Sequence, residues 1–335
     1  MCISPEARPD SERRDVIEAL LAKMTLQEKI GQLQQLDASG NPLAEDFLQA
    51  VRSGRVGSII NQVDPETSNT LQRVAVEESR LGIPLISARD VIHGFRTVFP
   101  IPLGQAASWN PGLVEQAARI SALEARRNGV HWTFAPMVDI SRDPRWGRIA
   151  ESFGEDPYLS GCLGASMVRG FQTSDLRNHG AIAACAKHFA GYGASESGRD
   201  YNSTNIPDNE LRNVYLPPFR AAAEAGAATF MCSFGDLDGI PATANDYLIR
   251  QILRGEWGFD GLVVSDWNSV KELVVHGLCE DARAAAKAAA SAGVDIEMAG
   301  DAYQEHLESL VVSGQISIET IDEMVLNVLR LKERL

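Results

Sequence analysis

The chain has 335 residues, 44% of them hydrophobic, so it can bury a large core as one barrel or as two ordinary domains. Its net charge of −14 and its lack of a clustered basic patch exclude nucleic acid as an expected partner. No apolar run approaches the roughly 20 residues that span a bilayer, so no membrane partner is expected either.

The first 15 residues are polar, contain two prolines and have no apolar segment of the kind that a signal peptide needs. The localisation is therefore left open between a cytoplasmic protein and a periplasmic one whose leader has been removed. The five cysteines lie far apart and form no CxxC pair, which favours buried free thiols over disulfides or a metal site.

Eight short apolar segments alternate with helical patterns along the chain. The predicted strands are residues 31–36, 56–60, 84–90, 131–139, 182–189, 229–234, 262–266 and 294–298. The predicted helices lie near 43–53, 66–80, 111–128, 156–171, 208–225, 245–254, 281–292, 301–312 and 317–334. This alternation indicates an α/β fold with a parallel sheet, and eight units favour a (β/α)8 TIM-type barrel. The first strand holds three Gln and one Gly, so irregular closure is expected there.

In such a barrel, the residues that follow the strands face the active site. The residues at these positions and in the adjoining loops are Asp90, Asp139, Lys187, His188, Met231, Phe234, Asp266, Trp267 and Glu297, with the loop arginines Arg96, Arg148 and Arg199. Charged groups bind sugar hydroxyls in pairs, and aromatic faces take the C–H side of a sugar ring. The set therefore favours a sugar site.

Some of these residues also fit a purely structural role. Asp139 precedes the segment Ile-Ser-Arg-Asp-Pro-Arg, and for it we favour a loop cap or an ion pair with Arg142 or Arg145. Glu297 fits a buried ion pair as well as it fits a site.

The residues Lys187 and His188 end an apolar run, which favours function because a buried lysine needs a negative partner or a ligand. Asp266 follows the buried run Gly-Leu-Val-Val-Ser and fits a nucleophile, a base or a helix cap. A metal enzyme is a further alternative, but only His188 lies at a strand end, so we expect neither a metal nor another cofactor.

Taken together, these motifs resemble glycoside hydrolase family 3, its β-glucosidase-like group, from about Met24 to the end of the chain. The matching strings are MTLQEKIGQL (24–33), DVIHGFRTVFP (90–100), DPRWGR (143–148), EDPY (155–158), KHF (187–189), GRDY (198–201) and GFDGLVVSDW (258–267). The resemblance implies an N-terminal extension with a first helix over residues 1–23 and the N-terminal barrel of the family over 24–335.

The resemblance also implies a retaining hydrolase of terminal β-D-glucosyl residues, with a β-glucoside or oligosaccharide as its partner. Asp266 would then be the nucleophile that forms a covalent glycosyl-enzyme. The implied ligands of sugar hydroxyls are Asp90, Arg96, Arg148, Lys187, His188 and Arg199, and the implied apolar wall is Met231, Phe234 and Trp267.

The proton donor is where the match fails. In the β-glucosidase-like members it is a Glu from a second α/β domain, and this chain stops where the barrel of the family ends, so we expect that domain to be absent. Single-domain members use a His-Asp dyad after Lys-His-Phe, but Tyr192 stands at the position of that His and no Asp-Ser-His follows. For Glu196, on the same loop, we favour an exposed loop acid.

Two further hypotheses follow from the missing acid/base. One is a sugar-binding barrel that has lost catalysis. The other is one half of a split enzyme, whose acid/base comes from a second domain or another chain.

Overall fold

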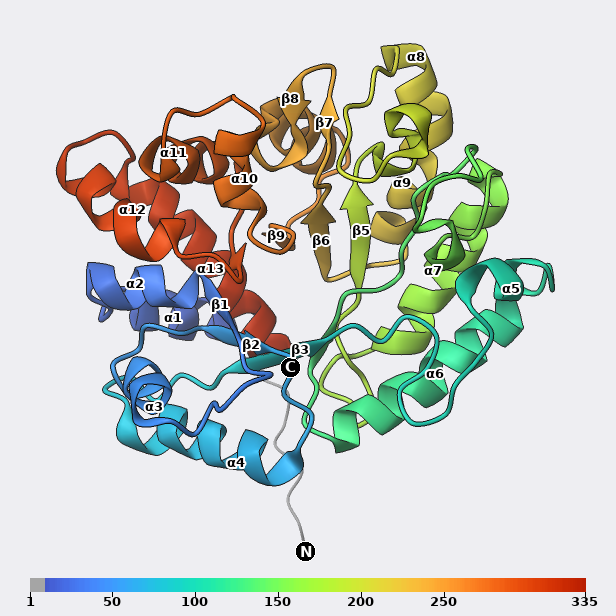
Figure 1. The fold of residues 1–335 in the computed structure, drawn as a ribbon. Helices are drawn as coiled ribbons and strands as arrows, with labels where there is room; N and C mark the ends of the chain where they lie inside the picture. Colours follow the sequence, from blue (N-terminus) through green and yellow to red (C-terminus); the bar gives the residue numbers. More distant parts are fainter. Residues whose placement is uncertain (1–9) are drawn as a thin grey trace, which may run out of the picture.

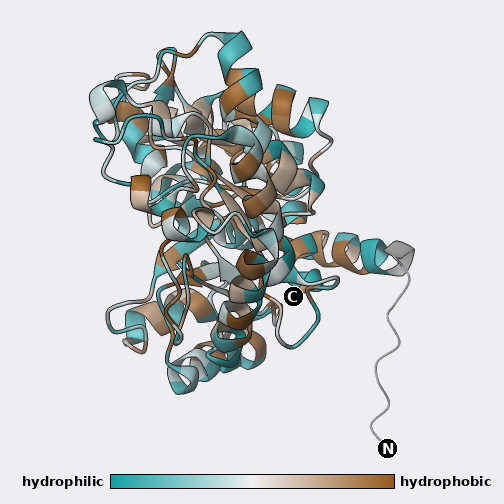
Figure 2. Cartoon of the chain, turned by 90° about the vertical axis from the view of Figure 1, so that its right-hand side faces the viewer, coloured by the Kyte–Doolittle hydropathy of each residue, from teal (hydrophilic) through white to brown (hydrophobic). Residues whose placement is uncertain are grey.

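The computed structural model describes residues 10–335. Of the segment expected to be an extension with a first helix, the helix is α1 (Asp10–Leu21), and residues 1–9 lie outside the described residues. Helix α1 projects beside the C-terminal end of the chain (Figure 2).

Eight parallel strands form the centre of the molecule, with the helices around them (Figure 1). They are β1 (Gln34–Asp37), β2 (Ser58–Ile60), β3 (Ile86–Arg89), β4 (Trp132–Thr133), β5 (Cys185–Phe189), β6 (Thr229–Cys232), β9 (Leu262–Val264) and β10 (Glu297–Met298). Hydrogen bonds join them in two arcs, β10-β1-β2-β3-β4 and β5-β6-β9. Parallel bridges join β4 to β5 and β9 to β10, which closes the predicted (β/α)8 barrel.

The irregular pairing lies elsewhere than expected. β1 pairs regularly with both β10 and β2, because the Gln34 amide finds a buried partner in Glu297 at 3.2 Å instead of disrupting the strand. The ladder is instead interrupted at the joints between the two arcs, where isolated bridges form. Backbone hydrogen bonds still close these joints, for example from Cys185 N–H to Ala135 O and from Ser265 N–H to Ile296 O, both at 2.9 Å. Pro136 lies in the segment after β4 and has no N–H to continue a ladder toward β5.

Each predicted strand is present but shorter than predicted, and one prediction began too early. Gly31 and Gln32 belong to a helix, α2 (Leu26–Gln32). Thr25 and Glu28 form a capping box at its start, in which each side chain accepts a hydrogen bond from the backbone of the other. The local helix signal at 25–28 therefore prevails over the apolar run that follows it.

The helices cover the outside of the barrel, and apolar and polar residues alternate along them (Figure 2). The predicted ones are α3 (Glu45–Arg52), α4 (Pro65–Arg73), α6 (Pro111–Arg127), α7 (Pro157–Gln172), α9 (Pro217–Glu224), α11 (Ala282–Ala292), α12 (Ala302–Val312), α13 (Ile318–Arg334) and the π-helical segment Tyr247–Glu256. Three of them, α4, α6 and α7, begin in the same way, with an Asp or Asn cap followed by Pro.

Several short elements were not predicted. They are α5 (Pro102–Ala106), α10 (Ser269–Val275) and the hairpin of β7 (Asp236–Leu237) and β8 (Ile240–Pro241). The predicted helix 208–225 is divided into α8 (Asp208–Glu210), a π-helical turn and α9, and α9 begins at Pro217, where proline fits the first turn of a helix. These elements lie in the loops that position the site rather than in the regular barrel.

The cysteines at 162, 185, 232 and 279 are free thiols, of which Cys185 and Cys232 are buried, and Cys2 lies outside the described residues. Within residues 10–335, no helix is both long enough and apolar enough to cross a bilayer.

Candidate active site

Strand β9 delivers Asp266 to the carboxyl end of the barrel. The strand is fully buried, and Asp266 lies two residues beyond its end with 7% of its surface exposed. Its Oδ1 accepts a hydrogen bond from the Trp267 N–H at 2.7 Å. Its Oδ2 has no hydrogen-bond partner among the described residues, and His188 Nε2 lies 3.5 Å from it. One carboxylate oxygen is thus fixed by the backbone and the other is free to react.

The charges around Asp266 oppose the cost of burying it. Burial raises the pKa of its carboxyl to about 7, and Lys187, the Trp267 N–H and the Arg148 guanidinium each act to lower that pKa. A carboxyl with a pKa near neutrality is ionised in a substantial fraction of molecules at pH 7, which a nucleophile requires.

His188, on β5, is fully buried and held by Asp139. The Asp139 Oδ2 accepts a hydrogen bond from the His188 backbone N–H at 2.9 Å, and it lies 2.8 Å from the ring nitrogen Nδ1. Burial lowers the pKa of His188 well below its usual value, and the nearby cations Arg148 and Lys187 lower it further, so the imidazole is neutral. Burial raises the pKa of Asp139 to about 7.

The position of Asp139 corrects the role that the sequence favoured for it. Arg142 pairs with Glu210 at 3.1 Å, and Arg145 pairs with Asp143 at 2.7 Å. Asp139 is instead fully buried against a residue 49 positions later in the chain.

Lys187, the neighbour of His188, forms an ion pair with Asp90. The Lys187 Nζ lies 2.8 Å from Asp90 Oδ1, and the lysine is buried while the Asp90 side chain is half exposed. Burial acts to lower the pKa of Lys187, but the charge of Asp90 prevails and raises it, so the lysine stays protonated. The exposed part of Asp90 remains available to bind hydroxyl groups.

Arg148 joins this cluster from the loop after β4. Its Nε and Nη2 donate to both oxygens of Glu151, at 2.7 and 3.0 Å, and its guanidinium lies 5.7 Å from the centre of the Tyr192 ring. Burial acts to lower the pKa of Arg148, but Glu151 and Asp266 raise it, so the arginine keeps its charge. Glu151 therefore holds a permanent positive charge near Asp266.

The three residues predicted as an apolar wall lie on or just after β6 and β9, the strand that carries Asp266. Met231 lies on β6 opposite Val264 of β9, and it is buried. Phe234 packs with Tyr192, Met137 and Trp146 in a separate apolar cluster. Trp267, adjacent to Asp266 in the chain, has 41% of its surface exposed. An exposed aromatic face beside a carboxylate suits the C–H side of a sugar ring.

Three residues at predicted positions lie away from the cluster or have a structural role. Arg96 was expected beside Asp90, but it is exposed and its guanidinium donates to Asn128, after α6, at 3.0 Å. Arg199 is exposed on its loop. The carboxylate of Glu297 accepts hydrogen bonds from the Ala302 and Tyr303 N–H groups, so it caps α12.

Three residues of the cluster were not predicted for it. Asp139 carried a strand-end signal but was given a local role. Glu151 lies three residues after Arg148, and this spacing, which brings the two side chains together, is the signal in the sequence that indicates their ion pair. Tyr192, whose ring lies 5.2 Å from that of His188, is fully buried.

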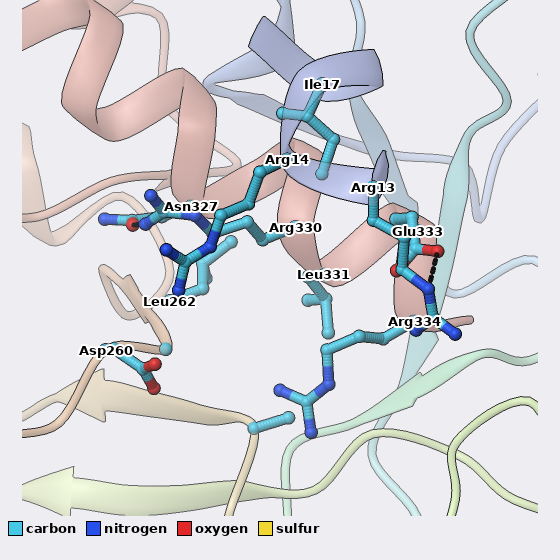
Figure 3. Close-up of a pocket in the computed structure, with 12 residues that line it drawn as sticks. Arg13, Arg14, Ile17, Asp260, Leu262, Asn327, Arg330, Leu331, Glu333 and Arg334 are labelled. Atoms are coloured by element: carbon cyan, nitrogen blue, oxygen red, sulfur yellow. Dashed lines mark hydrogen bonds and ion pairs between the residues drawn. The ribbon is translucent and has the colours of Figure 1, made fainter. Parts of the chain in front are cut away.

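A separate hollow of about 570 Å³ lies at the opposite end of the barrel (Figure 3). Its lining includes Ala228, Gly261 and Leu262, where β6 and β9 begin, and several arginines of α1 and α13. Arg13 pairs there with Glu333 at 3.3 Å. Because barrel enzymes act at the carboxyl ends of their strands, the candidate active site is the cluster at Asp266 and not this hollow. In residues 10–335, no three His, Cys, Asp or Glu side chains gather as ligands of a metal ion.

Comparison with known proteins gives the family. The model of the glycosyl hydrolase family 3 N terminal domain matches residues 25–331. A periplasmic beta-glucosidase of Salmonella typhimurium is 42% identical over 98% of this chain and 42% of its own length, and a lysosomal beta glucosidase of Dictyostelium discoideum is 33% identical over 96% and 44%. The structure of a beta-glucosidase from Listeria innocua in complex with glucose superposes with a TM-score of 0.92 at 42% identity, over 96% of this chain and 47% of that one.

The chain therefore belongs to glycosyl hydrolase family 3, as the motifs predicted. It spans less than half the length of these relatives.

Proposed function

We propose that this barrel carries the sugar subsite and the nucleophile of a retaining β-glucosidase, with Asp266 as the nucleophile. The observation that supports this most directly is the free Oδ2 of Asp266, which is buried near two charged cations, Lys187 and Arg148. Relatives that are named beta-glucosidases, and a relative solved with glucose, support the choice of sugar.

In the proposed reaction, Asp266 Oδ2 attacks the anomeric carbon, the bond to the leaving group breaks, and the leaving group departs with the bonding electron pair. Water then attacks the same carbon and gives its proton to the group that protonated the leaving group, or to solvent where no such group is present, and Asp266 is released as a carboxylate. A natural leaving group needs a proton in the first step. We propose that this proton comes from a group outside the barrel, in a second domain or on another chain, because the other acids of the cluster are either paired with a cation or, in the case of Asp139, fully buried against His188. Asp90 pairs with Lys187, and Glu151 pairs with Arg148.

The test is intact-mass spectrometry with peptide mapping after incubation with 2-deoxy-2-fluoroglucosyl fluoride. Fluoride leaves without being protonated, so the barrel alone should form one covalent adduct, on Asp266. The Asp266→Asn variant should form none. The Asp260→Asn variant, which makes the same change at an exposed acid just before β9, is the control and should still form the adduct.

An adduct on another residue, or an adduct that persists in Asp266→Asn, would show that Asp266 is not the nucleophile. Glucose binding without any adduct would favour the alternative of a sugar-binding barrel without catalysis. If the adduct forms, adding a separately expressed second domain of a relative should raise turnover of unactivated glucosides. No gain on mixing would count against an acid/base supplied from outside the barrel.

A further inference from the structure

One oxygen of Asp139 binds two groups of the same residue. The Asp139 Oδ2 contacts both the backbone nitrogen of His188, at 2.9 Å, and its ring nitrogen Nδ1, at 2.8 Å. Both residues are buried, and Asp139 Oδ1 has no partner among the described residues. Such a two-point contact fixes the main chain and the ring of His188 at the same time.

This contact determines which ring nitrogen carries the proton. An ionised Asp139 has no proton to give, so its Oδ2 accepts both the backbone N–H and the proton on Nδ1. The neutral ring then has no proton on Nε2. The charged and polar groups that face or surround His188, namely Asp139, Asp266, Arg148, Lys187 and Tyr192, include two cations that disfavour a second proton on the ring.

The consequence appears at Asp266. His188 Nε2 and Asp266 Oδ2 lie 3.5 Å apart, and neither has a hydrogen-bond partner among the described residues. Two acceptors that face each other do not bond, so the reactive oxygen keeps its lone pairs. In the other tautomer, the Nε2–H would donate to Oδ2 and would reduce its nucleophilicity.

We infer that Asp139 is a positioning residue that acts through His188: it holds the imidazole with its proton on Nδ1, so that Nε2 accepts a sugar hydroxyl and Asp266 Oδ2 stays free of protein hydrogen bonds. The inference rests on the proposed function, because it takes Asp266 as the nucleophile. Carboxylates act in the same way on metal-bound histidines, where they accept the other ring N–H and so fix the tautomer and orientation of the ring.

Two variants of Asp139 distinguish the effect of its hydrogen-bond acceptor from the effect of its negative charge. Asp139→Asn keeps a carbonyl oxygen that can accept both His188 donors. Its amide nitrogen cannot take that place, because it would face the His188 N–H as donor against donor. Asp139→Ala removes the acceptor. Long-range proton–nitrogen NMR spectra of histidine-labelled protein report the tautomer without any substrate, and a His188→Gln spectrum assigns the signal.

We expect the Nδ1-protonated tautomer in the wild type and in Asp139→Asn, and a shift toward the Nε2-protonated tautomer in Asp139→Ala. The rate of adduct formation on Asp266 should fall roughly 10- to 100-fold in Asp139→Ala, as for other partners that orient a functional histidine, and only a few-fold in Asp139→Asn. A purely structural role would lower stability but would leave the tautomer unchanged.

An Nε2-protonated ring in the wild type would overturn the inference, and so would a wild-type rate and tautomer in Asp139→Ala. The wild-type spectrum alone decides the first point if Asp139→Ala does not fold. Failure of the proposed function is seen separately, since a wild type without an adduct would refute Asp266 as nucleophile whatever tautomer the spectra show.

Discussion

Buried carboxylates occur in two regions of this barrel, and their oxygens differ in how many partners they have. Beside β10, Asp295 Oδ2 accepts hydrogen bonds from Arg254 at 2.8 Å and from the Val263 N–H at 2.7 Å, while its Oδ1 accepts one from Asn327 at 3.0 Å. Glu297 likewise has partners on both oxygens.

At the candidate active site, one oxygen of Asp139 and one of Asp266 have no hydrogen-bond partner among the described residues. Burial raises the pKa in both regions, to about 6 for Asp295 and to about 7 for Asp266. Depth of burial therefore does not distinguish the two regions. The number of partners does, because a fully bonded carboxylate stabilises the fold, whereas a bare oxygen is available to a substrate.

The largest effect that tests this comparison is on stability, at Asp295. Asp295→Ala would leave the Arg254 guanidinium, the Asn327 amide and the Val263 N–H without their partner. We expect a loss of roughly 3–5 kcal/mol in the free energy of unfolding, measured with urea. Asp260→Ala, which changes an exposed acid just before β9, should cost much less. Equal losses in the two variants would contradict the structural role of Asp295.

At Asp266, by contrast, a substitution is expected to raise the free energy of unfolding. The pKa of its carboxyl is 3.8 in a model peptide and about 7 in the fold, so its contribution to stability is fully present below pH 4 and is lost as the pH rises through 7. Asp266→Asn cannot ionise, so the variant should gain on the order of 1 kcal/mol over the wild type at about pH 8 and little at about pH 4. Urea unfolding at both pH values measures this, and a variant less stable at both would contradict it.

The smallest effect concerns the pH dependence of the reaction. Lys187 lowers the pKa of Asp266, so in Lys187→Met that pKa should rise. The midpoint of the rate of adduct formation against pH, near 7 in the wild type, should then move upward, and the rate at pH 7 should fall roughly a few-fold from this cause. Lys271→Met, which removes a cation paired with Asp301, is the control. A weaker substrate affinity alone would lower the rate without moving the midpoint.

Much of the fold could be predicted because its signals are local. Strand and helix periods, and caps such as Asp156 before Pro157, lie within a few residues of one another. Errors arose where two local signals competed, as at Gly31, where a capping box and an apolar run overlap. The joints between the two arcs were missed because strand pairing depends on distant segments.

The site could be predicted only in part, for the same reason. The positions of Asp90, Lys187, His188 and Asp266 at strand ends follow from the barrel itself. The choice of partner does not, since Asp139 and His188 are 49 residues apart in the chain and Lys187 and Asp90 are 97 apart. The position of the Arg96 side chain depends on the path of a long loop, and the sequence of that loop has no periodic pattern from which its path could be predicted.

The pair of Lys187 and Asp90 also has a mechanical consequence. Asp90 follows β3 in the five-stranded arc, and Lys187 lies on β5 in the three-stranded arc, so the ion pair adds a side-chain link between the two arcs near the joint where the ladder is interrupted. A ligand that draws Asp90 away from Lys187 loosens this tie, whereas a ligand that binds both side chains strengthens it. For the proposed sugar subsite, we therefore expect occupancy and the rigidity of the barrel at this joint to be coupled.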